Sequence, residues 1–397
     1  MVNEKMRELG ARRSVIRELF EYGKKRKAEI GAENVFDFSL GNPSVPSPAV
    51  VGETLGKLVA ETDPVALHGY TSAQGDAGVR AAIADYLNKT YQANVTADCF
   101  YLTVGAAASL TVSLTALLNP GDEVILLAPF FPEYRVFVER TGAKVVSVLC
   151  RNGDFQPDFD ALEAAVTPRT RAVIVNSPNN PTGAVLTEEN AERLGAFLRK
   201  ASQRIGQPIY LIADEPYREL VYGDIKVPYL TNYYDNTLVC YSFSKSISLP
   251  GERIGYILVS PRAEDFTALY QAVCGAGRAL GFVCAPALFQ YLIPSVLGVT
   301  SDITVYDTNR RLLHDALTEY GFEVVPPDGA FYLFVRSPEP DANAFCERAK
   351  RHELLLVPSD DFGCKGYARI AYCVTTEQIE RSLPAFRALA ASYGMTK

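Results

Sequence analysis

Short apolar runs alternate with longer amphipathic stretches through the first two thirds of the chain. The runs have the length and composition of buried β-strands, and the stretches between them have apolar residues at helical spacing. The predicted strands are 99–104, 123–128, 144–149, 171–176, 209–213 and 237–241. This alternation indicates a mostly parallel sheet with helices on both faces, which is an α/β fold. One further run, 254–259, returns after a short connection, and we expect it to pair antiparallel.

The pattern changes in the last third of the chain, where short strands and helices predict a second, smaller α+β domain. Near the start, residues 5–30 carry apolar side chains at helical spacing and predict one amphipathic helix. We therefore expect an N-terminal segment, 1–45, that packs with the small domain. A large domain, 46–290, and a small C-terminal domain, 291–397, complete the predicted organisation.

The composition limits what kind of protein this is. Of 397 residues, 48% are hydrophobic and 21% are charged, as in soluble globular proteins. The net charge of -7 argues against a nucleic-acid surface, and no apolar run is long enough to span a membrane. The eight cysteines are scattered and the three histidines are not clustered with them. We therefore expect reduced thiols, a cytoplasmic location and no metal site.

Hydroxyl and cationic side chains gather after the predicted strand that ends at Tyr241. Ser242, Ser244 and Lys245 follow it, and Arg253 comes eight residues after the lysine. Serine hydroxyls and a guanidinium suit a phosphate. A lysine in the same pocket loses part of its hydration, which lowers its pKa toward nucleophilic use. Taken alone, the motif fits an ordinary solvated loop equally well.

A second anion site is predicted where Gly105, Ala106 and Ala107 lead from a strand into a helix. Free amides and the helix dipole favour a negative group there, although a plain strand-to-helix turn has the same sequence features. Ligands bind parallel sheets at the carboxyl ends of the strands, so residues that follow strands are expected to converge on one crevice. These residues are Gly105, Phe131, Asn180, Asp214 and Lys245.

Four ordered motifs carry a family resemblance. They are Ser177–Gly183, Asp214–Tyr217, Ser242–Lys245 and Arg253. The chain resembles the class I/II aminotransferases, which are fold-type I pyridoxal-phosphate-dependent enzymes, and it is similar to the bacterial aspartate aminotransferases. The similarity runs from about Gly41 to Arg369. It implies a mostly parallel seven-stranded sheet, a smaller α+β domain and a homodimer with shared active sites.

The resemblance assigns roles around the cofactor, pyridoxal 5'-phosphate. Lys245 is expected to hold the cofactor aldehyde as a Schiff base and, once displaced by the substrate amine, to move the proton at the substrate Cα. Asp214 is expected to keep the pyridine nitrogen protonated, so that the ring is an electron sink. Tyr217 and Asn180 match residues that hydrogen-bond the phenolic oxygen, and Phe131 matches the aromatic residue stacked on the ring.

The phosphate and the substrate also have matching residues. The phosphate is expected to contact backbone amides at a helix start, side chains of the lysine loop, and one tyrosine from the second subunit. These residues are Ala106, Ala107, Ser242, Ser244, Arg253 and, from the second subunit, Tyr70. Arg369 matches the arginine that clamps the substrate α-carboxylate, with Asn180 beside it, and Gly41 matches a glycine whose backbone approaches that carboxylate.

Two positions depart from the pattern of aspartate-specific enzymes. Ala107 stands where related bacterial aspartate aminotransferases often carry a lysine near the distal carboxylate, and Phe131 stands where tryptophan is frequent. A distal carboxylate then needs another cation, and Arg278, alone among small and apolar residues, is the candidate. A structural ion pair of Arg278 at the subunit interface is an equally good interpretation.

The leading interpretation is an aminotransferase that moves an amino group from an L-amino acid, with an aspartate-like donor favoured, to a 2-oxoacid such as 2-oxoglutarate. A pyridoxal-phosphate-dependent carbon–sulfur β-lyase is the alternative within the family, because the cofactor-binding residues do not separate the two activities. A non-catalytic pyridoxal-phosphate-binding regulator is a more distant alternative. It is expected to carry a DNA-binding domain before Phe36 and does not require both Lys245 and Asp214.

Overall fold

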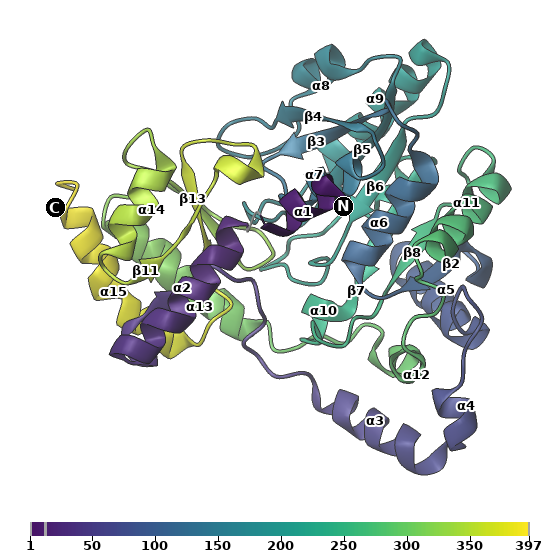
Figure 1. Ribbon diagram of the computed structural model, residues 1–397, viewed down its shortest axis with the longest axis horizontal. Coiled ribbons are helices and arrows are strands. Elements are labelled where there is room, and N and C mark those ends of the chain that lie inside the picture. Colours follow the sequence, from purple (N-terminus) through teal and green to yellow (C-terminus); the bar gives the residue numbers. More distant parts are fainter. Residues whose placement is uncertain (1, 12–13, 396–397) are drawn as a thin grey trace.

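A seven-stranded sheet forms the centre of the larger of two units (Figure 1). Its strands are β2 (Phe100–Thr103), β3 (Glu123–Ala128), β4 (Lys144–Leu149), β5 (Thr170–Asn176), β6 (Tyr210–Asp214), β7 (Thr237–Ser242) and β8 (Gly255–Val259). The computed structural model, which describes residues 2–11 and 14–395, orders them β2-β8-β7-β6-β5-β3-β4. Strand β8 pairs antiparallel with β2 and β7, and the other pairs are parallel. The predicted α/β fold, including the antiparallel return, is confirmed.

Helices cover both faces of this sheet because the strand side chains point alternately to the two sides. On β3, Val124 and Leu126 pack into one core, and Ile125 and Leu127 pack into the other. The first core is closed by α6 (Ala106–Leu117), α7 (Glu133–Glu139) and α11 (Phe266–Ala279). The second is closed by α5 (Ala77–Tyr91), α8 (Phe159–Ala165), α9 (Glu188–Ile205) and α12 (Ala287–Val296). The short α10 (Phe243–Ser246) follows β7, while α3 (Ala49–Glu61) and α4 (Pro64–His68) extend from this unit.

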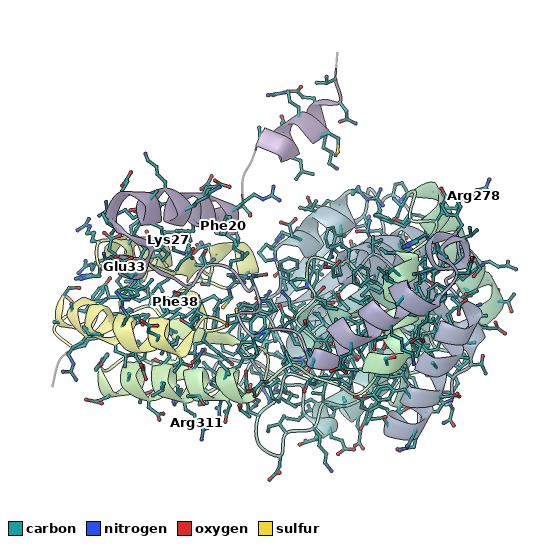
Figure 2. All side chains as sticks on the ribbon, turned by 90° about the horizontal axis from the view of Figure 1, so that it is seen from below. Phe20, Lys27, Glu33, Phe38, Arg278 and Arg311 are labelled. Atoms are coloured by element: carbon teal, nitrogen blue, oxygen red, sulfur yellow. The ribbon has the colours of Figure 1, made fainter. Side chains whose placement is uncertain are left out.

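The smaller unit has its own sheets and its own core. Strands β9 (Val324–Val325), β10 (Tyr332–Arg336), β12 (Val357–Pro358) and β13 (Tyr367–Ala371) form an antiparallel sheet in the order β12-β13-β10-β9. Strand β1 (Phe36–Asp37) pairs in parallel with β11 (Leu354–Leu355). The helices are α2 (Val15–Ile30), α13 (Thr304–Glu319), α14 (Ala342–Lys350) and α15 (Thr376–Ala391). Phe38 is buried in this core, so the chain after β1 is anchored to the small unit (Figure 2).

The N-terminal stretch differs from the single helix predicted over residues 5–30. The structure has α1 (Glu4–Ala11) and then α2, whose start is capped by the Ser14 side chain accepting a hydrogen bond from the backbone N–H of Arg17. Such a cap is typical of a new helix start, which is why the apolar periodicity alone was misleading. Residues 12–13 of the predicted helix lie outside the described residues. Helix α1 buries none of its residues and stands away from both units (Figure 2).

Helices α11 and α12 lie close to the predicted end of the large domain. Helix α12 packs against α3 and α5 of the large unit, although the predicted boundary at residue 290 divides it between the two domains. Helix α11 continues to Ala279, so Arg278 lies in its last turn. Among the described residues, no helix is long and apolar enough to cross a lipid bilayer.

Candidate active site

A cleft of about 350 Å³ lies at the carboxyl ends of β5, β6 and β7, facing the small unit. It brings together most of the residues that the sequence singled out. Its lining includes Gly41, Ala106, Ala107, Phe131, Asn180, Asp214, Tyr217, Ser242, Ser244, Lys245, Arg253 and Arg369. Residues spread over the whole chain therefore meet at one edge of the sheet, as the alternation of strands and helices predicts.

Lys245 lies inside α10, directly after β7, and its amine is held over the cleft. Its Nζ donates to the backbone oxygen of Gly41 at 2.7 Å and lies 5.6 Å from the centre of the Phe331 ring. Burial lowers the pKa of Lys245 to about 8, and the nearby cations Arg253 and Arg369 act in the same direction. A substantial fraction of this amine is therefore neutral near pH 8, as a nucleophile or base requires.

Asp214 ends β6 at the floor of the cleft, and only one of its two oxygens is used. Oδ2 accepts a hydrogen bond from the Tyr134 hydroxyl and a longer one, 3.4 Å, from Nδ2 of Asn176. Oδ1 is buried and has no hydrogen-bond partner among the described residues. Burial raises the pKa of Asp214 to about 7, and the bond from Tyr134 opposes this rise. An unpaired buried carboxylate oxygen is costly, so it points to a missing donor at this position.

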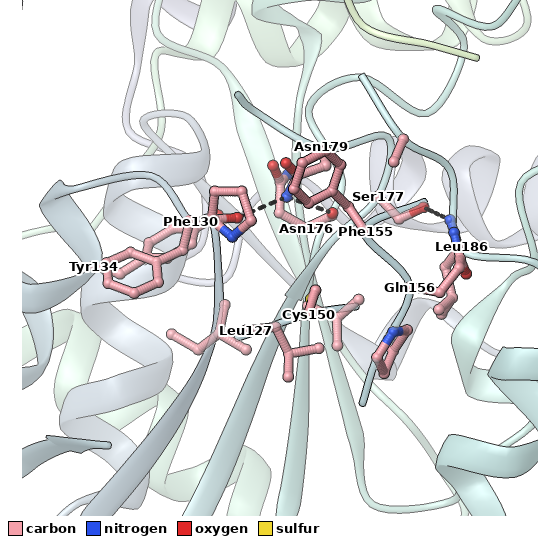
Figure 3. Close-up of a pocket in the computed structure, with 15 residues that line it drawn as sticks. Leu127, Phe130, Tyr134, Cys150, Phe155, Gln156, Asn176, Ser177, Asn179 and Leu186 are labelled. Atoms are coloured by element: carbon pink, nitrogen blue, oxygen red, sulfur yellow. Dashed lines mark hydrogen bonds between the residues drawn. The ribbon is translucent and has the colours of Figure 1, made fainter. Parts of the chain in front are cut away.

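A small internal cavity of about 40 Å³ lies behind Asp214 (Figure 3). Tyr134 and Asn176, which donate hydrogen bonds to Asp214, also line this cavity. Its other walls come from segments after β3, β4 and β5, including Phe130 and Gln156. The cavity has room for one or two water molecules and not for a cofactor. The larger cleft is therefore the candidate active site, and the cavity marks the layer of side chains that supports it.

Tyr217 and Asn180 form the sides of the cleft next to Asp214. The Tyr217 hydroxyl is 2.9 Å from that of Tyr332 on β10, and burial raises the pKa of Tyr217 well above its usual value. The backbone N–H of Asn180 donates to Oδ1 of Asn176 at 2.7 Å. Because Asn176 contacts both Asp214 and Asn180, it couples the floor of the cleft to its side.

Arg369 reaches the cleft from β13 of the small unit. Its Nη1 donates to Oδ1 of Asn180 at 3.0 Å, and its Nη2 donates to the backbone oxygen of Ser39. Nε is buried without a partner among the described residues, and the residue is 2% exposed. The guanidinium lies 4.7 Å from the centre of the Tyr332 ring, which fixes its plane. A buried guanidinium of this kind suits a carboxylate.

A cradle for an anion lies at the start of α6, beside the lysine loop. The Ser242 and Ser244 hydroxyls are 2.7 Å apart, and Nη1 of Arg253 donates to Oγ of Ser244 at 3.2 Å. Gly105 has a φ of +90°, and a Cβ there would lie 2.5 Å from Nη2 of Arg253. Glycine is thus required both by the backbone and by the close approach of the arginine.

Two predicted residues are not brought to this cleft by their own chain. Tyr70 is 99% exposed, next to α4, and Arg278 is exposed near the end of α11, at the outer end of the large unit (Figure 2). Neither lines the cleft. Any contact of Tyr70 or Arg278 with an active site would therefore be with that of a partner subunit.

The structure also adds residues that the sequence reasoning missed, notably Tyr134, Asn176, Tyr332 and Glu133. Asn176 is the last residue of β5, so its place at a strand end was a readable signal. Tyr134 lies three residues after Phe131, and this spacing was a weaker signal. No pattern in the sequence pairs Tyr332 with Tyr217, because the two come from different units.

The comparison with protein families gives a clear result. The family described as aminotransferase class I and II matches residues 33–386, most of the chain. The chain therefore belongs to the class I and II aminotransferases, and it is a pyridoxal-phosphate-dependent aminotransferase, since members of this family use that cofactor.

Individual relatives agree with this family. The chain is 29% identical to an aspartate aminotransferase of Thermotoga maritima, covering 93% of this chain and 95% of that one. It is 32% identical to an aspartate/prephenate aminotransferase of Thermus thermophilus, with 87% and 88% covered. Among solved structures, an amino transferase from Eubacterium rectale has 57% identity, a TM-score of 0.97 and 99% of each chain covered. The Thermus thermophilus aspartate aminotransferase with maleate has 26% identity and a TM-score of 0.85, with 96% and 98% covered.

The cleft fits pyridoxal phosphate on its own chemistry. The unpaired Oδ1 of Asp214 can accept from a protonated ring nitrogen, and the Lys245 amine is free to react with an aldehyde. The cradle of Ser242, Ser244 and Arg253 can bind the phosphate, together with the amides at the start of α6. Each chemical part of the cofactor thus has a matching group in one cleft.

Proposed function

We propose that this cleft transfers the amino group of an L-amino acid to a 2-oxoacid, with Lys245 as the group that holds the cofactor and moves the proton. One observation carries the proposal. The amine of Lys245, the unpaired Oδ1 of Asp214 and the unpaired Nε–H of Arg369 lie in one cleft. Bound pyridoxal phosphate supplies the electron sink that accepts the electron pair of the substrate Cα–H bond.

The side chains divide the remaining work. Arg369 binds the substrate α-carboxylate and so fixes where the Cα lies. The neutral amine of Lys245 would take the Cα proton as a general base and, as the ammonium so formed, would return a proton to the aldehyde carbon of the cofactor as a general acid. Asp214 would hold the proton on the ring nitrogen, Tyr217 and Asn180 would bind the phenolic oxygen, and Phe131 would cover the ring.

The side chain of the substrate is a separate question. The expectation of an aspartate-like donor with 2-oxoglutarate came from the resemblance, and the candidate partner of its distal carboxylate, Arg278, does not line the cleft of its own chain. The proposed reaction leaves the side chain of the donor open, and aspartate with 2-oxoglutarate is one arm of its test.

We also propose a homodimer in which Tyr70 of each chain completes the phosphate site of the other. The support is the full exposure of Tyr70 and the exposed apolar residues Val59 and Val65 beside it. Mixing Tyr70→Ala chains with Lys245→Ala chains tests this directly, because only a mixed dimer contains one intact site. Activity above that of either variant alone is expected, and no gain on mixing refutes the shared site. The proposed location is the cytoplasm, in keeping with eight cysteines that form no disulfide.

The decisive experiment for the reaction has two readouts. Borohydride reduction of the holoenzyme, followed by peptide mapping, is expected to find the cofactor on Lys245 and on no other lysine. A panel of amino acids with a 2-oxoacid acceptor is expected to give a new amino acid and no free ammonia. Ammonia and pyruvate from cysteine conjugates without any acceptor would instead identify a β-lyase.

A further inference from the structure

Part of the cleft has no role in binding the cofactor or the α-carboxylate. Once those groups are assigned, the lining that remains includes Asn176, Pro216, Pro250 and Tyr332, and a further wall formed by the start of α2, the loop after β1, the first turns of α6 and the start of α7. The side chains are Ser14, Ile16, Leu40, Leu110 and Glu133. This wall is apolar except for one hydroxyl and one carboxylate.

The N-terminal segment makes a contact with α7. Lys5 of α1 donates from Nζ to the backbone oxygen of Glu139, at the end of α7, over 3.1 Å. The N-terminal segment therefore touches the end of α7 at this point, although α1 otherwise stands away from both units (Figure 2). Ser14 and Ile16 follow that segment, Glu133 begins α7, and all three side chains line the cleft.

The charges of the cleft make Glu133 distinctive. Among the lining residues that the structure describes, the cations are Lys245, Arg253 and Arg369, and each already has a partner in the proposed reaction. The acids are Asp214, which faces the cofactor ring, and Glu133. The Glu133 side chain is half-buried and makes no hydrogen bond or ion pair with any residue in the described part of the chain.

We propose that Glu133 makes this site select amino donors whose side chain ends in a positive charge, such as lysine or ornithine. The inference rests on the proposed function, because it needs the α-carboxylate at Arg369 and the Cα at Lys245. An aliphatic chain then packs along Ile16, Leu40 and Leu110, and the terminal ammonium meets the carboxylate of Glu133. A distal carboxylate at the same place is repelled, since like charges in a partly buried site oppose binding.

The competing role for Glu133 is structural. An acidic residue in the first turn stabilises a helix through the dipole, and Glu133 occupies that turn of α7. A purely structural glutamate changes the melting temperature when it is replaced and leaves the choice of substrate unaltered. The two roles therefore predict different measurements on the same variant.

Binding of unreactive acids to the holoenzyme separates the inference from the reaction. The probes are 6-aminohexanoate, hexanoate and hexanedioate, which share a carboxylate and chain length and differ only in the distal group. Calorimetry is expected to give the order 6-aminohexanoate, then hexanoate, then hexanedioate. In Glu133→Gln the advantage of 6-aminohexanoate over hexanoate is expected to fall by about five- to twentyfold, as for the loss of a partly buried charge pair.

The donor half-reaction, followed by the visible absorption of the holoenzyme, gives the second readout. Lysine and ornithine are expected to react faster than norleucine and 2-aminoadipate in the wild-type protein, and Glu133→Gln is expected to remove that preference. Glu139→Gln, at the exposed end of the same helix, is the matched control and should change neither readout.

The outcomes are distinguishable. If hexanedioate binds best, or if Glu133→Gln leaves the advantage of 6-aminohexanoate over hexanoate unchanged, the assignment of Glu133 is wrong even when amino transfer is observed. If the binding order holds and no amino acid is deaminated, the proposed reaction fails while the charge selection by Glu133 stands.

Discussion

Arg369 and Asn180 are 189 residues apart in the chain, and a hydrogen bond of 3.0 Å joins Nη1 of the arginine to Oδ1 of the amide. The arginine belongs to β13 of the small unit, and the asparagine belongs to a loop of the large unit. The contact therefore joins the two units at the cleft, and it aims a buried guanidinium at the place where a substrate carboxylate would bind.

Replacing this guanidinium should affect all donors alike. In Arg369→Lys the fork of parallel donors is lost, and we expect kcat/KM to fall by about thirtyfold or more, corresponding to about 2–5 kcal/mol for a broken charge pair in a closed site. Donors with acidic, neutral and basic side chains should lose equally, because all share the α-carboxylate. Arg336→Lys, at the exposed end of β10, is the control. A loss limited to one kind of side chain would contradict the assignment of Arg369.

Replacing Asp214 and replacing its neighbour Tyr134 should lower the reaction rate by different amounts. Asp214→Asn removes the charge that holds the ring proton, and we expect the rate to fall by about 10²-fold or more. Tyr134→Phe keeps that charge and removes only one hydrogen bond to it. The loss of rate in Tyr134→Phe should therefore be smaller than the loss in Asp214→Asn.

The pH profile separates these roles further. The bond from Tyr134 lowers the pKa of Asp214, so in Tyr134→Phe that pKa should rise and the acid limb of the kcat/KM profile should move to higher pH. An acid limb that does not move would show that Tyr134 contributes packing only.

Gly105 offers a test of the phosphate cradle. In Gly105→Ala the new Cβ meets Arg253, so the arginine must shift, and we expect the dissociation constant of the cofactor to rise by about tenfold. Gly121→Ala is the matched control, since Gly121 has the same φ of +90° and no atom within 4 Å of an added Cβ. Both variants carry similar backbone strain. Equal losses of cofactor affinity would show that strain, and not Arg253, is responsible.

Glu219 should make stability depend on pH. It accepts a hydrogen bond of 2.9 Å from the Tyr241 hydroxyl, and its Oε2 is buried without a partner among the described residues. Burial raises the pKa of Glu219 from 4.5 to about 7. Because its pKa is raised on folding, protonation of Glu219 stabilises the folded state. This stabilisation is complete below pH 4.5 and is lost as the pH rises through 7.

The variant Glu219→Gln isolates this effect. Its free energy of unfolding relative to the wild type should increase between pH 5 and pH 8, by about 2–3 kcal/mol at about 1.4 kcal/mol per unit of pKa. Denaturant unfolding of the cofactor-free protein at several pH values measures this. A difference between the two proteins that stays constant with pH would rule out Glu219 as the titrating group.

The sequence predicts the large sheet well because its strands are buried on both faces and read as continuous apolar runs. Asp214 and Lys245 could be found because each falls at or just beyond the end of such a run. Their roles, and that of Arg369, came from resemblance, since a single chain gives no physical link between residues so far apart.

What the sequence missed depends on contacts between distant segments. Tyr134 is 80 residues from the carboxylate that it supports, and nothing local distinguishes it from any other tyrosine in a helix. Helix α12 has the composition of either unit, and only its packing against α3 and α5 decides to which it belongs. Glu133 reads as an ordinary helix start until the cleft beside it is known.

The pairing of β1 with β11 also has a consequence during synthesis of the chain. Phe36 emerges from the ribosome roughly 300 residues before its partner Leu354. At about 5–20 residues per second this is a delay of about 15–60 s, in which the apolar segment around Phe38 has no place to fold. Nascent chains therefore need protection there, and the segment with Gly41 joins the cleft only when translation is almost finished.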